Sequence, residues 1–175
     1  KRPVFYAGNG IRLSGGYRQF REAVEGLGIP VVTCWDSVDL MEDSHPLYVG
    51  RGGGMGDRAG NFAVQNADLV LAVGNRLSIR QVGYNWETWA REAFVIMVDV
   101  DPAELKKPTI HVELPVCGDA KDFLQKVTEC LKEEKERGSL TGPLFLGKEW
   151  LKACGNWKKA YPVTQPRHWE EDGQY

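Results

Sequence analysis

Small and polar residues follow four apolar stretches of the chain, and their types suit contact with a nucleotide. They lie at Gly8-Asn9-Gly10, Gly74-Asn75-Arg76, Asp99-Val100-Asp101 and Gly118-Asp119. Glycine lets backbone amides come close to a phosphate, and a carboxylate accepts hydrogen bonds from ribose hydroxyls. Arginine offers two parallel donors to phosphate oxygens. The residue types therefore suit a nucleotide-containing ligand at these positions.

The same residues have a simpler interpretation as turns. Turns that follow buried strands favour glycine, asparagine and aspartate, so each place taken alone is more often a turn than a site. Four such places favour a shared site, because ligands of open α/β sheets bind beyond the carboxyl ends of the strands. On the residues alone, both interpretations stay open.

Apolar stretches alternate with helical patterns, which is typical of a parallel sheet covered by helices on both faces. We expect strands at 4–7, 29–34, 69–73, 94–100 and 112–116. We expect helices at 14–27, capped by Ser14, and at 57–66, 86–91, 119–137, capped by Asp119, and 144–161, with a glycine-rich loop at 49–60. The pattern predicts an α/β fold, a doubly wound, mostly parallel six-stranded sheet of the Rossmann-like type.

Several familiar chemistries are disfavoured. The dinucleotide fingerprint G-x-G-x-x-G fails because Leu13 stands where its third glycine belongs, and Gly15-Gly16-Tyr17 lacks the lysine of a phosphate loop. The four cysteines show no CxxC spacing, which indicates reduced thiols and no zinc site. The three histidines stand in no catalytic motif. We therefore predict no catalytic residue and no metal ligand within the chain.

The composition bears on which partners the chain can bind. The 175 residues include 22 basic and 24 acidic side chains, a net charge of −2, which gives no support to nucleic-acid or anionic-membrane binding. No apolar run approaches the roughly 20 residues of a membrane span. Reduced cysteines make a cytoplasmic location the expectation. The start at Lys1, without an initiator Met, suggests a piece of a longer protein, although a processed chain would begin in the same way.

Residues 2–127 resemble the middle domain of thiamine-diphosphate-dependent enzymes, and they are most similar to the acetolactate synthase group. The matching stretches are R-P-V-F-Y-A-G-N-G at 2–10, L-G-I-P-V-V-T at 27–33, D-S-H-P-L-Y-V-G-R at 43–51, N-A-D-L-V-L-A-V-G-N-R-L at 66–77, V-D-V-D-P-A-E-L at 98–105 and L-P-V-C-G-D-A-K-D-F-L at 114–124. The segment W-K-K-A-Y-P-V at 157–163 looks like the lead into the family's next domain. The number, order and spacing of these stretches make the resemblance specific.

The resemblance implies a non-catalytic central domain at 1–137, of the deoxyhypusine-synthase-like NAD/FAD-binding fold. It also implies a linker helix and tail at 138–175 that lead to an absent C-terminal domain. In such enzymes the first domain supplies the glutamate that activates thiamine diphosphate, and the third binds its diphosphate and Mg²⁺. The parent would decarboxylate a 2-oxo acid and transfer the resulting carbanion equivalent. It would be a homodimer or homotetramer.

The resemblance also implies a cofactor in this domain, because acetolactate synthases hold FAD there and other branches hold ADP or nothing. The contacts would fall at Gly8, Asn9, Gly10, Gly53, Gly54, Met55, Gly56, Gly74, Asn75, Arg76, Asp99, Val100, Asp101, Gly118 and Asp119. The sequence differs from the family's motifs at two places, both expected near the flavin ring of FAD. The family's Gly-Met-His-Gly loop reads Gly53-Gly54-Met55-Gly56 here, and its Asp-Asp-Arg reads Ser78-Ile79-Arg80.

Three hypotheses follow. The first is a cofactor-holding central domain of a thiamine-dependent synthase or lyase. The second is a structural spacer whose nucleotide site is vestigial. The third, a free-standing NAD-dependent protein deacylase, ranks last because that class carries paired CxxC motifs for zinc, which this chain lacks.

Overall fold

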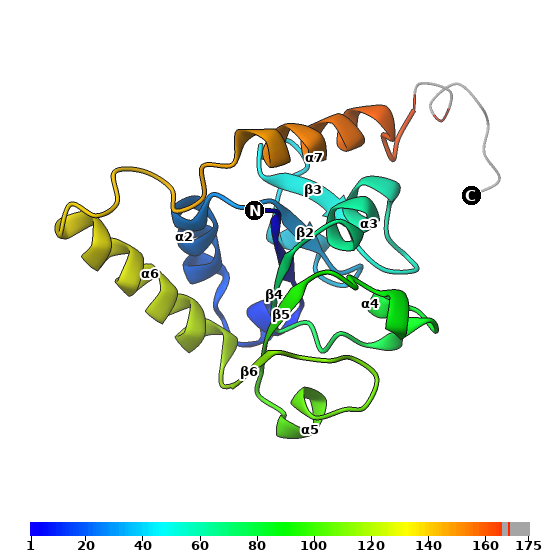
Figure 1. Ribbon diagram of the computed structural model, residues 1–175, viewed down its shortest axis with the longest axis horizontal. Helices are drawn as coiled ribbons and strands as arrows, with labels where there is room; N and C mark the ends of the chain where they lie inside the picture. Colours follow the sequence, from blue (N-terminus) through cyan, green and yellow to red (C-terminus); the bar gives the residue numbers. More distant parts are fainter. Residues whose placement is uncertain (166–167, 169–175) are drawn as a thin grey trace.

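The computed structural model describes residues 1–165 and residue 168, and its centre is a parallel sheet (Figure 1). The strands are β1 (Pro3–Ala7), β2 (Val31–Thr33), β3 (Tyr48–Arg51), β4 (Leu69–Val73), β5 (Phe94–Asp99) and β6 (Leu114–Cys117). They lie in the order β3-β2-β1-β4-β5-β6, and every neighbouring pair is parallel. The predicted six-stranded, doubly wound α/β fold is confirmed.

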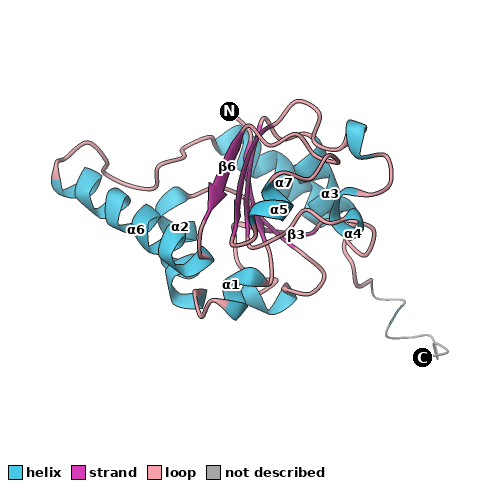
Figure 2. Ribbon diagram, turned by 90° about the horizontal axis from the view of Figure 1, so that it is seen from below, coloured by secondary structure: helices cyan, strands magenta, loops and turns pink. Residues whose placement is uncertain are grey.

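Helices cover both faces of this sheet, and Figure 2 shows the sheet nearly edge-on between them. The helices are α1 (Gly10–Leu13), α2 (Tyr17–Leu27), α3 (Arg58–Gln65), α4 (Ile79–Val82), α5 (Pro102–Leu105), α6 (Ala120–Glu136) and α7 (Lys148–Ala160). Residues of α2 and α6 share one buried cluster, and residues of α3 and α7 share the other. The sheet therefore separates two hydrophobic cores.

Strand β1 buries every side chain, as its unbroken apolar sequence predicts. In β1, Val4 and Tyr6 join the core beneath α3 and α7, whereas Phe5 and Ala7 join the core beneath α2 and α6. All four side chains are fully buried. A strand with no polar side chain is stable only when both of its faces are covered, so this pattern fixes β1 at the centre of the molecule.

The structure corrects three local predictions. Residues 49–51, which we placed in the glycine-rich loop 49–60, belong to the edge strand β3 beside β2. The helix expected over 14–27 begins only at Tyr17, because Gly15 adopts a left-handed φ of 70° after the separate short helix α1 ends at Leu13. Ser14 is not its cap, since its hydroxyl donates to the carbonyl of Ile11 instead. The helix expected at 86–91 is only a short 3₁₀ turn at Trp86–Thr88.

Helix α7 packs on the same core as α3. Trp150 and Cys154 are buried there, and the indole nitrogen of Trp150 donates to the carbonyl of Pro3 at 2.9 Å. The division of the chain at 137/138 into a central domain and a linker stays a prediction. Helix α6 ends at Glu136, and α7 packs on the core beneath α3. Most of the predicted tail at 162–175 lies outside the described residues.

Candidate functional site

The order of the strands reverses beside β1, and this places a crevice at the carboxyl end of the sheet. The chain adds β2 and β3 on one side of β1 and then returns to add β4 on the other. Such a switch point is where doubly wound sheets bind ligands. The four polar clusters predicted from the sequence follow β1, β4, β5 and β6, so they lie along this one edge.

Glycines let the two turns at the switch point touch. The backbone N–H of Gly10 donates to the carbonyl of Gly74 at 2.9 Å. A Cβ atom on Gly8 would lie 2.2 Å from the Gly74 carbonyl oxygen, which is far inside van der Waals contact. Gly74 itself has a left-handed φ of 59°. Side chains are therefore excluded at Gly8, Gly10 and Gly74, where the two turns meet.

A cleft with a volume of about 460 Å³ opens at this edge, and we call it the switch-point cleft. Nine of the predicted site residues line it: Asn9, Gly10, Gly74, Asn75, Arg76, Asp99, Val100, Gly118 and Asp119. Leu13, Ser14, Asp36, Val98 and Ala120 complete its walls. The structure thus brings together residues that are more than one hundred positions apart in sequence.

Asn75 supplies a buried donor at the cleft. Its side chain is 5% exposed, and its Oδ1 accepts from the backbone N–H of Leu77 at 3.1 Å. Its Nδ2 has no hydrogen-bond partner among the described residues. An unpaired buried donor costs about 1–3 kcal/mol, so this amide suits an acceptor brought by a ligand.

Arg76, the residue predicted to bind a diphosphate, is paired within the chain. Its Nε and Nη2 atoms donate to Oε1 of Glu104 at 2.9 and 2.7 Å, and its side chain is 67% exposed. The hydrogen bond and charge of Glu104 raise the pKa of Arg76. Burial favours a higher pKa for Glu104, but hydrogen bonds from Arg76 and Lys107 outweigh it and lower that pKa. We call this group the Arg76–Glu104 pair.

The predicted aspartates divide between the cleft and helix caps. Asp99 is buried at the cleft, where its Oδ1 accepts from the backbone N–H of Asp101 at 3.0 Å. Asp101 does not line the cleft; it caps α5 by accepting from the N–H of Ala103. Asp119 caps α6, as predicted, and accepts from the N–H of Lys121 at 2.8 Å. Asp99 is therefore the one of the three predicted aspartates that is buried at the cleft and does not cap a helix.

The glycine loop, residues 53–56, lies apart from the cleft. Asn61 holds it, because its Oδ1 accepts from the Gly53 N–H at 2.8 Å and its Nδ2 donates to the Gly53 carbonyl at 3.0 Å. Gly54 N–H donates to the carbonyl of Arg80, which lies within α4. Met55 projects to solvent with 66% exposure. None of residues 53–56 lines the switch-point cleft.

The sequence analysis missed Glu104, the partner of Arg76, and Asp36, one of the five further residues on the cleft walls. Glu104 lies in the short helix α5, whose start Asp101-Pro102 is a recognisable capping signal. Asp36 follows β2, so the rule that selects residues after strand ends would have included it. Neither the pairing of Glu104 with Arg76 nor the position of Asp36 on the cleft wall could be read from spacing alone.

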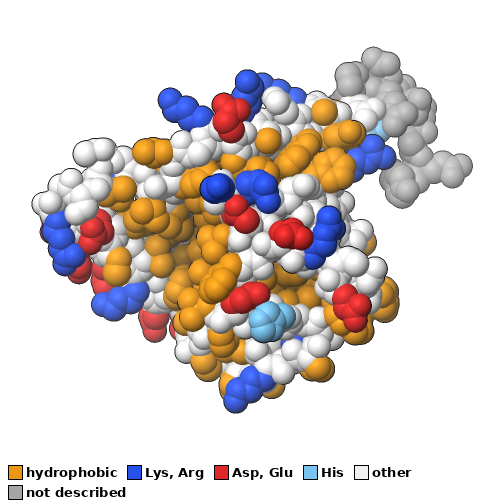
Figure 3. Space-filling model, in the orientation of Figure 1, with side chains coloured by type: hydrophobic (Ala, Val, Ile, Leu, Met, Phe, Trp, Pro, Cys, Tyr) orange, Lys and Arg blue, Asp and Glu red, His pale blue; other side chains and the backbone are white. Residues whose placement is uncertain are grey.

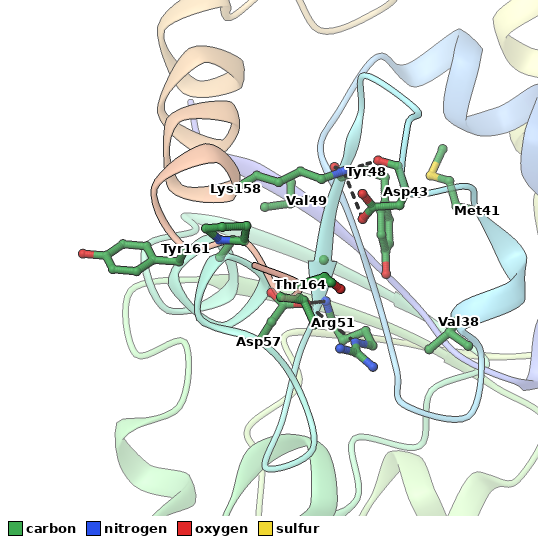
Figure 4. Close-up of a pocket in the computed structure, with 14 residues that line it drawn as sticks. Val38, Met41, Asp43, Tyr48, Val49, Arg51, Asp57, Lys158, Tyr161 and Thr164 are labelled. Atoms are coloured by element: carbon green, nitrogen blue, oxygen red, sulfur yellow. Dashed lines mark hydrogen bonds and ion pairs between the residues drawn. The ribbon is translucent and has the colours of Figure 1, made fainter. Parts of the chain in front are cut away.

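A second cavity, of about 400 Å³, lies between β3 and the end of α7 (Figure 4). The Lys158 ammonium reaches from α7, donates to the carbonyls of Asp43 and Tyr48, and pairs with the Asp43 carboxylate at 3.4 Å. Asp57 accepts from the backbone N–H of Arg51 at 2.8 Å. Lys158 and Asp57 are thus partnered within the chain, and we interpret this cavity as the joint between α7 and the sheet.

Among residues 1–165 and 168, no group of three or more His, Cys, Asp or Glu side chains is arranged to hold a metal ion. No helix in the described part of the chain is long and apolar enough to cross a membrane. The four cysteines are all free, with Cys34 and Cys154 buried. Burial raises the pKa of both buried thiols to about 12.

The strand order and the switch-point cleft define a doubly wound α/β domain of the Rossmann-like class. The family model described as "Thiamine pyrophosphate enzyme, central domain" matches residues 1–127. The chain belongs to this family, and the resemblance identified from the sequence motifs is confirmed.

Curated relatives are acetolactate synthases. The chain is 37% identical over 164 residues to the acetolactate synthase of Mycobacterium avium, a match that covers 94% of this chain and 25% of the relative. It is 30% identical over 171 residues to the isozyme 3 large subunit of Escherichia coli (strain K12), covering 98% and 29%. The probable large subunit of Methanococcus aeolicus is 32% identical over 168 residues, covering 91% and 26%. The chain spans about a quarter of the length of these relatives.

Proposed function

We propose that this chain is the central domain of a longer acetolactate-synthase-like enzyme and that it holds an adenine nucleotide, as FAD or ADP, in the switch-point cleft. The unpaired Nδ2 of buried Asn75 is the observation that carries the proposal. A ligand acceptor would satisfy it, and the cleft volume of about 460 Å³ lies within the usual range for small-molecule sites.

The residues present fit such a ligand. Gly10 and Gly74 line the cleft without side chains, so a phosphate could lie close to the backbone of these two turns. Arg76 stands beside the cleft with a guanidinium suited to two phosphate oxygens. The carboxylate of Asp99 would accept from ribose hydroxyls. Bound FAD would have no redox part in the main reaction, and these residues would bind and orient it.

The chemistry of the whole enzyme belongs to sequence outside this chain. We propose that the parent is a thiamine-diphosphate-dependent transferase or lyase that decarboxylates a 2-oxo acid and joins the product to an acceptor. Thiamine diphosphate supplies the electron sink when bound. Its diphosphate and Mg²⁺ would be held by the other domains, in a cytoplasmic homodimer or homotetramer. The 175 residues contribute no catalytic group in this proposal.

The alternative is a structural spacer with a vestigial nucleotide site, and one observation favours it. The guanidinium of Arg76 already pairs with Glu104 through two hydrogen bonds, so a diphosphate has to compete for it. In the spacer, the Arg76–Glu104 pair would be the permanent state, and the full-length protein would bind neither FAD nor ADP.

Calorimetric titration of the full-length protein with FAD and with ADP separates these functions. Arg76→Ala should weaken binding roughly ten- to a hundredfold, because a charge-assisted hydrogen bond contributes about 1.5–3 kcal/mol. Arg137→Ala is the matched control, since that arginine is 65% exposed and also pairs with glutamates, but on α6 away from the cleft. Wild type that binds neither ligand would establish the spacer. Equal binding by Arg76→Ala would refute the diphosphate role.

A separate assay addresses catalysis. The 175-residue chain, supplied with thiamine diphosphate, Mg²⁺ and pyruvate, should form no acetolactate above the buffer control. The expectation follows from the absence of the activating glutamate and of the Gly-Asp-Gly metal motif in this sequence. Turnover by the isolated chain would contradict the assignment of catalysis to the other domains.

A further inference from the structure

One face of the sheet is left open where β4, β5 and β6 begin. The strand register pairs Leu69 with Phe94, Leu71 with Ile96, and Ile96 with Leu114, so these five side chains share a face. This is the face that α2 and α6 cover further along the strands, because Val73 and Val98 of the same face are fully buried beneath them. Leu71, which is 8% exposed, lies at the covered edge of this region, and we call Leu69, Phe94, Ile96 and Leu114 the open sheet face.

Exposure on this face is unusual for a parallel sheet. Phe94 and Leu114 are each 47% exposed, although neighbouring strands of parallel sheets are normally covered on both sides. Leu144 and Leu146, on the segment between α6 and α7, are 59% and 73% exposed. Figure 3 shows hydrophobic side chains gathered around a hollow between α6, this segment and the sheet. An apolar hollow of this kind marks a surface that packs against protein.

We propose that the open sheet face is the docking surface for the part of the full-length enzyme that precedes residue 1. The relatives are about four times as long as this chain, and the family is that of a central domain, so sequence lies on both sides of it. The backbone nitrogen of Lys1 contacts Asp68, whose carbonyl accepts from the N–H of Phe94 at 3.0 Å. A preceding domain therefore joins the chain at the rim of this face.

Two other candidate occupants, the sequence that follows α7 and a second copy of this chain, fit less well. The chain that follows α7 leaves from the far side of the sheet, because residues 161–164 line the cavity beside β3. A second copy of this chain would have to match the face to itself, since a twofold interface pairs one patch with its own equivalent. Two hollows placed against each other leave a void between them, whereas a hollow accepts a convex surface. The preceding domain is thus the occupant that position and shape both favour.

Thiol labelling of the full-length protein tests the proposal. Phe94→Cys and Leu114→Cys are made separately in a background in which the exposed Cys117 and Cys130 are replaced by serine. Gln125→Cys is the matched control, at an exposed position of α6 outside the open sheet face. Maleimide modification is followed site by site by mass spectrometry. The thiols introduced by Phe94→Cys and Leu114→Cys should react at least about tenfold more slowly than the thiol of the control variant, because labelling then requires the interface to open.

The identity of the occupant is read from a photo-cross-linker, benzophenone maleimide, attached at either position. Cross-linked peptides should come from sequence that precedes residue 1. Labelling rates equal to that of the Gln125→Cys control would overturn the proposal, and so would cross-links to a second copy or to sequence beyond residue 175. Because two positions are tested, loss of folding in one variant leaves the other to decide. Neither measurement depends on nucleotide binding, so this proposal can fail while the proposed function stands.

Discussion

The switch-point cleft and the glycine loop both lie beyond strand ends, yet they differ in how their polar groups are used. At the cleft, Nδ2 of Asn75 is unpaired and a volume of about 460 Å³ is open. In the loop, both backbone groups of Gly53 are bound by Asn61, and Gly54 is bound to the carbonyl of Arg80. The switch-point cleft therefore keeps a hydrogen-bond donor that a ligand could use, whereas the polar backbone groups of Gly53 and Gly54 in the glycine loop are already bonded within the fold.

Under the proposed function, this difference would correspond to the two halves of an FAD molecule. The residues expected to contact the adenine-nucleotide half gather at the cleft, whereas the loop expected at the flavin half departs from the family by having Met55 in place of histidine. The adenine-nucleotide half of the proposed site is thus the better supported. The predictions below change one region at a time, and they proceed from the largest expected effect to the smallest.

Gly8→Ala should have the largest effect, on the cleft side of the comparison. Its new Cβ would lie 2.2 Å from the Gly74 carbonyl oxygen and 2.4 Å from Cα of Asn75, and both neighbours are backbone atoms that cannot rotate away. We expect a loss of about 3 kcal/mol or more in the free energy of unfolding. Urea denaturation of the 175-residue chain measures it.

The control for that variant is Gly118→Ala, at the same edge of the sheet. A Cβ on Gly118 would meet nothing within 4 Å, so the expected change stays within about 0.5 kcal/mol. Similar losses in the two variants would show that the contact between the turns does not set the stability of this edge.

Asn61→Ala tests the loop side. The change removes both hydrogen bonds to Gly53 and leaves a partly buried N–H without its partner, which should cost about 1–3 kcal/mol of unfolding free energy. The affinity of the full-length protein for ADP should stay unchanged. Asn66→Ala, which removes one exposed bond to the Phe62 carbonyl, is the milder control. A large loss of ADP binding in Asn61→Ala would mean that loop and cleft form one site.

Sequence patterns revealed the strands that are buried on both faces, because burial leaves an unbroken apolar run such as 69–73. They missed β3, an edge strand whose short run Tyr48-Val49 is followed at once by glycine. Asp119 was recognised as a helix cap because the signal is local. The partner of Arg76 was not, because Glu104 is 28 residues away and its position depends on how α5 follows β5. Interactions between near neighbours in sequence, such as a helix cap, could thus be predicted, whereas the pairing of side chains distant in sequence could not.

Met55→His examines whether the loop still belongs to a flavin site. Restoring the histidine of the family motif should strengthen FAD binding by the full-length protein about two- to tenfold, the worth of one hydrogen bond, and leave ADP binding unchanged. Met55→Leu controls for the loss of the methionine, whose side chain is 66% exposed. The assignment of the loop to the flavin half of the site would be wrong if ADP and FAD binding changed together.

Glu104→Gln should have the smallest effect, and it addresses the competition at the cleft directly. Because the pKa of Glu104 is lowered from 4.5, its carboxylate is charged at neutral pH and holds the guanidinium of Arg76. A neutral amide holds that guanidinium less strongly and removes a negative charge from beside the proposed diphosphate. An exposed ion pair is worth about 0.2–1 kcal/mol, so the affinity of the full-length protein for ADP should rise by up to about fivefold. Glu133→Gln, which alters the pairing of Arg137 on α6, should leave the affinity unchanged. A fall in affinity would assign Glu104 the opposite role, that of holding Arg76 in the position from which it meets the ligand.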